Sequence, residues 1–245
     1  MKKLILLTAF AVTTSISMAQ VSFGAQLGAN IGMGKLKSYD TDPLLATFTN
    51  KPSVGFMGGF VAEIPFAGKL AFRPELNFIQ KGGKTLLTSG NTSGADFKRT
   101  LNYIQLPLDV VYKLSVGSGS VFFGLGPEFA FGISGKDKVS GSSDPSVNKS
   151  YTVKFDGKKS DDYTSQSDAD KDHLKSFDIG ANIIAGYKLG MGVFFKLGYT
   201  LGFAETDPNK SNKAAADQTS YKNRGFNICV GYMLGGSKSS KKDKD

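Results

Sequence analysis

The sequence has 245 residues and a formal net charge of +9, and it contains 30 Gly, 19 Phe and 9 Tyr but one Cys, one His and no Trp. This composition excludes a disulfide framework within the chain and a zinc site built from cysteines and histidines. The basic residues form no run interleaved with aromatic residues, so nucleic acid is not an expected partner.

Residues 1–19 have the pattern of a secretory signal peptide. Lys2 and Lys3 precede an apolar stretch over about 4–12, and small residues at 17–19 are suitable for cleavage. The apolar stretch is too short to span a bilayer, so we predict a mature chain that begins at Gln20. No later stretch approaches the roughly 18 apolar residues of a membrane helix. If the chain is embedded in a membrane, it therefore has to form a closed β-barrel, because lipid offers no partner to an unpaired backbone group.

Apolar residues alternate with a period of two in several segments, and this period predicts strands. Eight such segments lie at about 21–33, 53–64, 70–81, 101–114, 121–133, 176–189, 193–204 and 224–234. Their lengths reach the roughly 9–11 residues that a tilted strand needs to cross a membrane. The connections after the second, fourth and sixth segments are short, whereas the others are long and polar, above all residues 134–175.

Short turns at one end and longer loops at the other are typical of bacterial outer-membrane barrels. We therefore predict an all-β fold: an eight-stranded antiparallel up-and-down transmembrane β-barrel over residues 20–236, in the outer membrane of a Gram-negative bacterium. A charged, disordered tail is expected over 237–245. Tyr112, Tyr187 and Tyr232 end three of the alternating segments on the short-turn side. They predict a periplasmic aromatic girdle, because tyrosine favours the membrane–water boundary.

The opposite face of the predicted strands is polar, which is the reverse of a soluble barrel that lines a ligand cavity with apolar residues. An eight-stranded barrel is only just wide enough for its own side chains, and charges buried inside it must be paired. We therefore predict a plug of salt bridges and no pore. The predicted interior network consists of Glu63, Arg73, Glu75, Asp109, Glu128 and Lys196. A purely structural network is the commoner explanation of such charges, and a proton or ion path is the alternative.

Three prolines fall within the predicted strands. Pro74, Pro107 and Pro127 cannot donate to a ladder, so we expect bulges or missing hydrogen bonds beside them, with the possibility that the faces slip by one residue.

Few residues offer catalytic or metal chemistry. His173 lies in the longest loop near Ser165, Ser167 and Ser176, and it is interpreted as a solvated loop residue. Asp168, Asp170 and Asp172 have the spacing that starts a calcium loop, but His173 and Ile179 occupy the positions that need Gly and Glu. Cys229 is interpreted as an inward packing residue. We predict no enzyme activity and no cofactor, and a loose surface calcium site stays open.

Three segments carry a resemblance to a known family. Residues 74–82 (PELNFIQKG), 101–108 (LNYIQLPL) and 126–128 (GPE) are similar to the outer-membrane β-barrel domain of PorT-like proteins. The resemblance implies an eight-stranded outer-membrane barrel. Some members of that family are associated with type IX secretion, whereas most have no assigned activity. The end of this chain departs from the usual pattern, because Leu234 and two glycines stand where outer-membrane barrels commonly finish on an aromatic residue.

The expected function is that of a small, non-enzymatic barrel with a structural or interaction role and long extracellular loops. Its expected partners are outer-membrane lipid and other outer-membrane or secretion proteins. An accessory subunit of a secretion or uptake complex is the first alternative, followed by a lipid-modifying enzyme and a soluble β-barrel binder.

Overall fold

The computed structural model describes residues 21–38, 47–89, 92–141, 148–159, 165–166, 171–208 and 219–235. The predicted signal peptide and the predicted tail over 237–245 lie outside the described residues. Within these ranges, no helix is long and apolar enough to cross a membrane.

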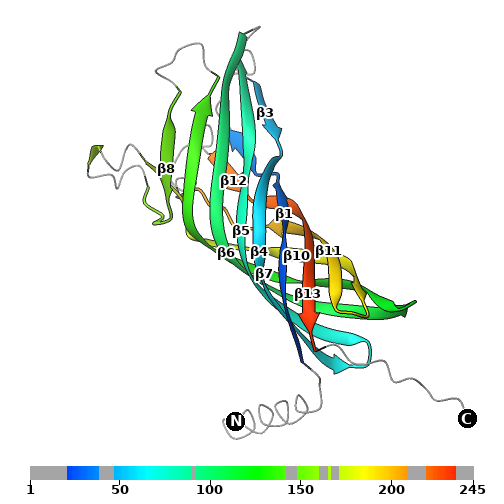
Figure 1. Cartoon of the computed structure of the whole chain (residues 1–245). Coiled ribbons are helices and arrows are strands. Elements are labelled where there is room, and N and C mark those ends of the chain that lie inside the picture. Colours follow the sequence, from blue (N-terminus) through cyan, green and yellow to red (C-terminus); the bar gives the residue numbers. More distant parts are fainter. Residues whose placement is uncertain are drawn as a thin grey trace, which may run out of the picture.

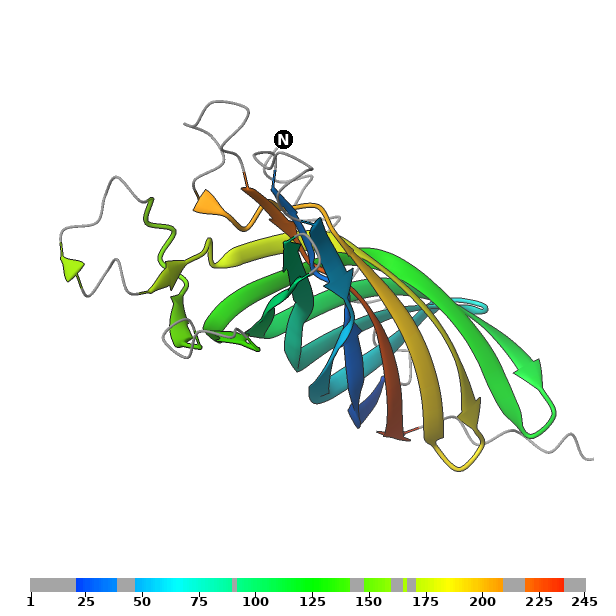
Figure 2. The same cartoon turned by 90° about the horizontal axis from the view of Figure 1, so that it is seen from above.

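Eight antiparallel strands close into a barrel (Figures 1 and 2). Each strand of the barrel pairs with the next one along the chain, and the first and last strands, β1 and β13, pair to close the wall. This arrangement confirms the predicted up-and-down topology. The barrel strands are β1 (Ser22–Gly32), β4 (Ser53–Ala67), β5 (Leu70–Ser89), β6 (Thr92–Val116), β7 (Gly119–Ser140), β10 (Phe177–Leu189), β11 (Val193–Gly202) and β13 (Arg224–Leu234).

The barrel has two unlike ends. At one end, which we call the turn end, short turns join β4 to β5, β6 to β7 and β10 to β11. At the other end, the far end, β5, β6 and β7 continue well past the barrel (Figure 1). There β3 (Thr47–Lys51) pairs with β5, and β8 (Ser150–Lys154) pairs with β7 and with the two-residue β9 (Asp172–His173). Two short strands, β2 (Lys35–Ser38) and β12 (Thr219–Lys222), form a separate pair.

The length of β5, β6 and β7 corrects the sequence prediction. The long polar loop expected between the third and fourth strands is a hairpin, in which β5 runs to Ser89 and β6 begins at Thr92. The hairpin lies beyond the barrel, and the residues buried on its inner face, such as Thr85 and Arg99, are polar, so its sequence shows no apolar alternation. The barrel already aligns β5 with β6. Their backbone hydrogen bonds therefore continue into the hairpin, because these bonds do not depend on the polarity of the side chains.

The two faces of the wall differ as the alternation predicts. Outward side chains are large, apolar and exposed, such as Phe60 at 70%, Leu125 at 68% and Leu197 at 59%. Inward side chains are polar and buried, such as Arg73 at 0% and Lys196 at 2%. A water-soluble barrel would gain stability from the reverse arrangement, because exposed apolar surface is unfavourable in water.

The three prolines interrupt the ladder without changing its register. Between β5 and β6, Pro74 lies opposite Leu108, and the pairing resumes in the same register at Asn77 and Gln105. A similar gap follows Pro107 in its pairing with β7. The missing hydrogen bonds were expected, because proline has no N–H to donate. The faces do not slip beside the prolines. The register between β6 and β7 shifts instead between Asn102 and Tyr103, where Ile133 is an extra residue on β7.

Two apolar clusters divide the interior. The cluster at the turn end consists of Val61, Val111, Phe122, Ile184, Phe194 and Met233. The cluster toward the far end consists of Met57, Ile79, Leu101, Tyr103, Ala130, Val153, Leu174 and Cys229. The charged interior residues lie against and between these clusters, so they are packed among side chains and not spread along an open lumen.

Candidate functional site

The interior polar residues follow from the period of the strands. On β5 the inward positions are Arg73, Glu75, Asn77, Ile79 and Lys81, which succeed each other by twos and are all buried. The facing strands supply their partners, and the result is two groups of charges at different heights in the barrel.

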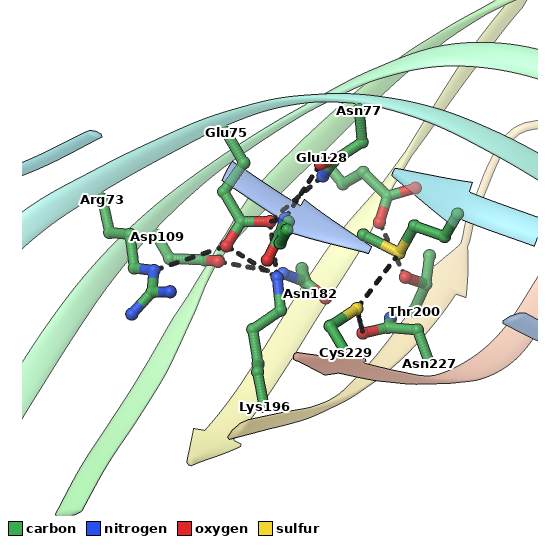
Figure 3. Close-up of polar contacts among 12 residues, drawn as sticks. Arg73, Glu75, Asn77, Asp109, Glu128, Asn182, Lys196, Thr200, Asn227 and Cys229 are labelled. Carbon is green, nitrogen blue, oxygen red and sulfur yellow. Dashed lines mark hydrogen bonds and ion pairs between the residues drawn. The ribbon is translucent and has the colours of Figure 1, made fainter. Parts of the chain in front are cut away.

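Glu75 is the centre of the group nearer the turn end, which we call the lower cluster (Figure 3). Lys196 Nζ lies 2.7 Å from Glu75 Oε1 and 2.5 Å from Oε2. Gln26 Nε2 and Asn77 Nδ2 also donate to Oε2, at 2.7 and 3.0 Å. A buried carboxylate is stabilised when several donors satisfy its lone pairs, and Glu75 has this arrangement.

Arg73 is held by charge and by aromatic rings. Its Nε lies 3.4 Å from Glu75 Oε1, and its Nη1 lies 3.6 Å from Glu63 Oε2. The guanidinium carbon lies 4.6 Å from the ring centroid of Phe122 and 4.8 Å from that of Phe194. The two ion-pair distances exceed those of good hydrogen bonds, so attraction between charges and cation–π contact stabilise this arginine.

Glu63 closes the lower cluster at the turn end. Lys113 Nζ donates to Glu63 Oε1 at 2.7 Å, and Lys188 Nζ lies 3.6 Å from the same atom. Both lysines are partly exposed, whereas Glu63 is buried. The lower cluster therefore runs from the centre of the barrel to its mouth.

Glu128 belongs to a second group, the upper cluster, and this corrects the prediction of one network. Lys81 Nζ donates to Glu128 Oε1 at 2.7 Å, and Thr200 Oγ1 donates to Oε2 at 2.7 Å. Lys81 also lies 3.6 Å from Asp178, which accepts a hydrogen bond from Asn223 at 2.9 Å. The closest cation to Glu128 is thus Lys81, which lies at the end of the predicted third strand and is absent from the predicted network. Counting by twos from Glu75 through Asn77 and Ile79 reaches this residue.

Asp109 lies opposite Arg73 in the pairing of β5 and β6. Its Oδ2 accepts a hydrogen bond from Asn182 Nδ2 at 2.9 Å (Figure 3). Of the six predicted network residues, the structure thus joins Glu63, Arg73, Glu75 and Lys196 directly, places Asp109 beside them and moves Glu128 to the upper cluster.

The three predicted girdle tyrosines lie at strand ends beside the short turns. Tyr112 and Tyr232 are exposed at 43% and 48%. The Tyr187 hydroxyl donates to the Val116 carbonyl at 3.1 Å, which ties β10 to the turn between β6 and β7. All three therefore lie at the turn end, with their rings on the outside of the wall.

Residues 150–159 and 171–176 form a cap over the far end of the interior. Val153 and Leu174 belong to the apolar cluster there, and the Phe155 ring contacts Tyr103 edge-on with centroids 5.4 Å apart. A side chain at Gly132 would collide with Phe155, because a Cβ there would lie 2.2 Å from the ring. Glycine at this position lets the cap reach the inner wall.

Ion pairs connect the cap to the extended wall strands. Arg99 donates to both carboxylate oxygens of Asp137, at 3.0 Å from Nε to Oδ1 and 2.6 Å from Nη2 to Oδ2, and it also pairs with Asp172. His173 is buried, not solvated as expected, and its Nδ1 lies 2.7 Å from Asp156 Oδ1. Burial works against ionisation of Asp156, but the contact with His173 prevails and lowers the pKa of this carboxyl.

The candidate calcium loop is not assembled by the described residues. Asp168 and Asp170 lie outside them, and Asp172 pairs with Arg99. Among the described residues, no group of three or more His, Cys, Asp or Glu side chains is placed to hold a metal. Cys229 lies in the apolar cluster, with its sulfur 3.6 Å from that of Met57.

The match to a protein family agrees with this architecture. The family described as "Outer membrane protein beta-barrel domain" matches residues 14–207. No curated protein matches the chain. Among solved structures, the outer membrane protein OprG from Pseudomonas aeruginosa has 12% identity and a TM-score of 0.46, covering 89% of this chain and 97% of that one.

Two further solved structures are similar at the same low identity. The attachment invasion locus protein Ail of Yersinia pestis has 13% identity and a TM-score of 0.38, covering 88% of this chain and 99% of that one. Neisserial surface protein A has 14% identity and a TM-score of 0.37, covering 87% and 97%. Since the family match spans most of the chain and the strands close as such a barrel requires, the protein belongs to the outer membrane protein β-barrel family and resides in the outer membrane of a Gram-negative bacterium.

Proposed function

We propose that this protein is a non-enzymatic, non-conducting barrel that anchors a folded extracellular sheet and acts through the surfaces of that sheet. The observation that carries the proposal is the filled interior. Glu75 and Lys196 pair at its centre, and apolar clusters pack above and below them. The paired charged side chains and the apolar clusters together fill the cross-section of the barrel, so little room is left for a continuous path of water.

The surface available for interaction lies at the far end. Short turns face the periplasm in outer-membrane barrels, so the far end faces the exterior. There β3, β5, β6, β7 and β8 form a continuous sheet beyond the barrel. Hydrogen-bonded strands hold a defined shape, so this sheet is suited to present one surface to partners, which we expect to be lipid and other outer-membrane proteins.

Planar bilayer recording tests the non-conducting barrel. The purified protein is expected to give no stable porin-scale steps at either polarity. Lys196→Ala in combination with Glu75→Ala removes the central pair and provides a positive control for a wider lumen. Steady large steps from the wild-type protein would refute the proposal and favour a channel.

An accessory role in a secretion or uptake complex, as in some PorT-like proteins, is a second candidate. The resemblance of three segments to PorT-like proteins supports it, and these segments lie on neighbouring strands, with Asn77 opposite Gln105 and Pro107 opposite Glu128. Crosslinking in native membranes followed by purification tests this role. Recovery of the same outer-membrane or periplasmic proteins in repeated experiments would support it, and recovery of the barrel alone would argue against it.

A further inference from the structure

A row of lysines crosses the sheet beyond the barrel. Lys51 of β3 lies directly opposite Lys84 of β5, Lys84 lies opposite Lys98 of β6, and Lys98 lies opposite Lys138 of β7. Directly paired residues of antiparallel strands project from the same face. With strands about 4.8 Å apart, the four ammonium groups follow one line of about 14 Å across the sheet.

This lysine row lies on the outer face of the sheet. Lys51, Lys84 and Lys138 are exposed and Lys98 is half-buried. The neighbouring residues Thr85, Arg99 and Asp137 project from the other face and are buried. The row therefore continues the outward face of the barrel strands, which carries the apolar band.

The row is not neutralised within the described part of the chain. None of its four lysines takes part in an ion pair there, and Lys136 adds a further positive charge beside Lys138. Among the described residues of this sheet, the acidic side chain on the same face is Asp96, two residues from Lys98. Like charges directly opposite each other in a sheet are destabilising, so the row lowers the stability of the free sheet.

The position of the lysine row relative to the apolar band indicates which partner neutralises its charge. The last outward apolar side chains below it include Val54, Ile104 and Ile133. The lysines lie three to six positions from these residues, on the side toward the far end. This separation is about 10–20 Å along a strand, and the difference in height is smaller because barrel strands are tilted. The row thus begins in the headgroup layer of the outer leaflet and extends just beyond it.

We propose that the lysine row binds the phosphate groups of a phosphorylated glycolipid of the outer leaflet, whose acyl chains lie against the apolar band below. Charge complementarity and continuity with the lipid-facing surface both favour this partner over a soluble polyanion. The proposal depends on the placement in the outer membrane and is independent of whether the barrel conducts.

Titration of the folded, immobilised protein in detergent with diphosphoryl lipid A tests the proposal. Wild type is expected to bind this lipid more tightly than the same glycolipid without phosphates, and more weakly as salt is added. Each lysine near an anionic surface contributes about fivefold, so Lys84→Gln with Lys98→Gln should raise the apparent Kd about 25-fold. The matched control is Lys69→Gln with Lys175→Gln, which removes two exposed lysines elsewhere and should leave the Kd unchanged.

Several outcomes would overturn the inference. They are equal binding of the phosphate-free glycolipid, equal losses in the two double variants, or displacement of lipid A by inorganic phosphate or a soluble sulfated polysaccharide at the same concentration of anionic groups.

A measurement of thermal stability completes the test. Lys98→Glu places a carboxylate between Lys84 and Lys138. It should raise the unfolding temperature in detergent while weakening lipid A binding. Loss of both stability and binding would assign Lys98 to the fold alone and refute the proposal.

Discussion

Lys196 Nζ lies within hydrogen-bond distance of both carboxylate oxygens of Glu75, and both side chains are almost fully buried. The two residues are 121 positions apart in the chain, on β11 and β5. Because β5 and β11 are not neighbours in the wall, this pair crosses the interior of the barrel. It therefore links the two sides of the wall directly.

Breaking this pair should destabilise the barrel. Lys196→Met leaves Glu75 with Arg73 as its nearest cation, and removing one partner of a buried ion pair typically costs about 3–5 kcal/mol. Urea unfolding in lipid vesicles measures the change. Adding Glu75→Gln to Lys196→Met should recover part of the loss, because no unpaired carboxylate then remains. Equal stability of the single and double variants would show that the two charges are not coupled.

The outward position of Leu197 predicts a cost that depends on the membrane. Leu197→Arg should lower the free energy of unfolding in vesicles by about 2–4 kcal/mol if the residue lies near mid-membrane. Thr200→Ser is the inward comparison on the same strand, because serine keeps the hydroxyl that donates to Glu128. It should change the stability little. The opposite order of the two variants would reverse the assignment of the faces.

Arg99 should stabilise the cap more than the barrel. Arg99→Met removes the pairs with Asp137 and Asp172, which leaves the buried Asp137 without its cation. Amide hydrogen exchange over 150–159 and 171–176 is expected to become faster, while exchange in β1 and β13 changes less. Lys98→Met is the neighbouring control on the outer face. If this control also accelerates exchange in the cap, the effect comes from the hairpin as a whole.

Cys229 reports on water access to the interior. Its thiol is buried among apolar side chains, so a maleimide should modify the folded protein far more slowly than the urea-unfolded protein. Cys229→Ser combined with Ser176→Cys provides an exposed comparison, which should react quickly in both states. Rapid modification of Cys229 in the folded barrel would contradict a closed interior.

Much of this architecture is readable from local sequence. The alternation of apolar residues places Leu197 outward and Thr200 inward, because the side-chain period of a strand is a property of its own backbone. The same alternation identifies Arg73, Glu75 and Lys196 as interior charges, and the tyrosine endings mark the turn end. These features need no knowledge of which strand lies beside which.

Only the tertiary structure decides which of these charges meet. Strand stagger and barrel closure bring Lys196 to Glu75 across the interior and place Lys81, not Arg73, beside Glu128. The same closure aligns the four lysines of the outer row and buries His173 within the cap. A period of two determines the face of each residue but not its height relative to a strand far along the chain, because height depends on the register of every pair around the barrel.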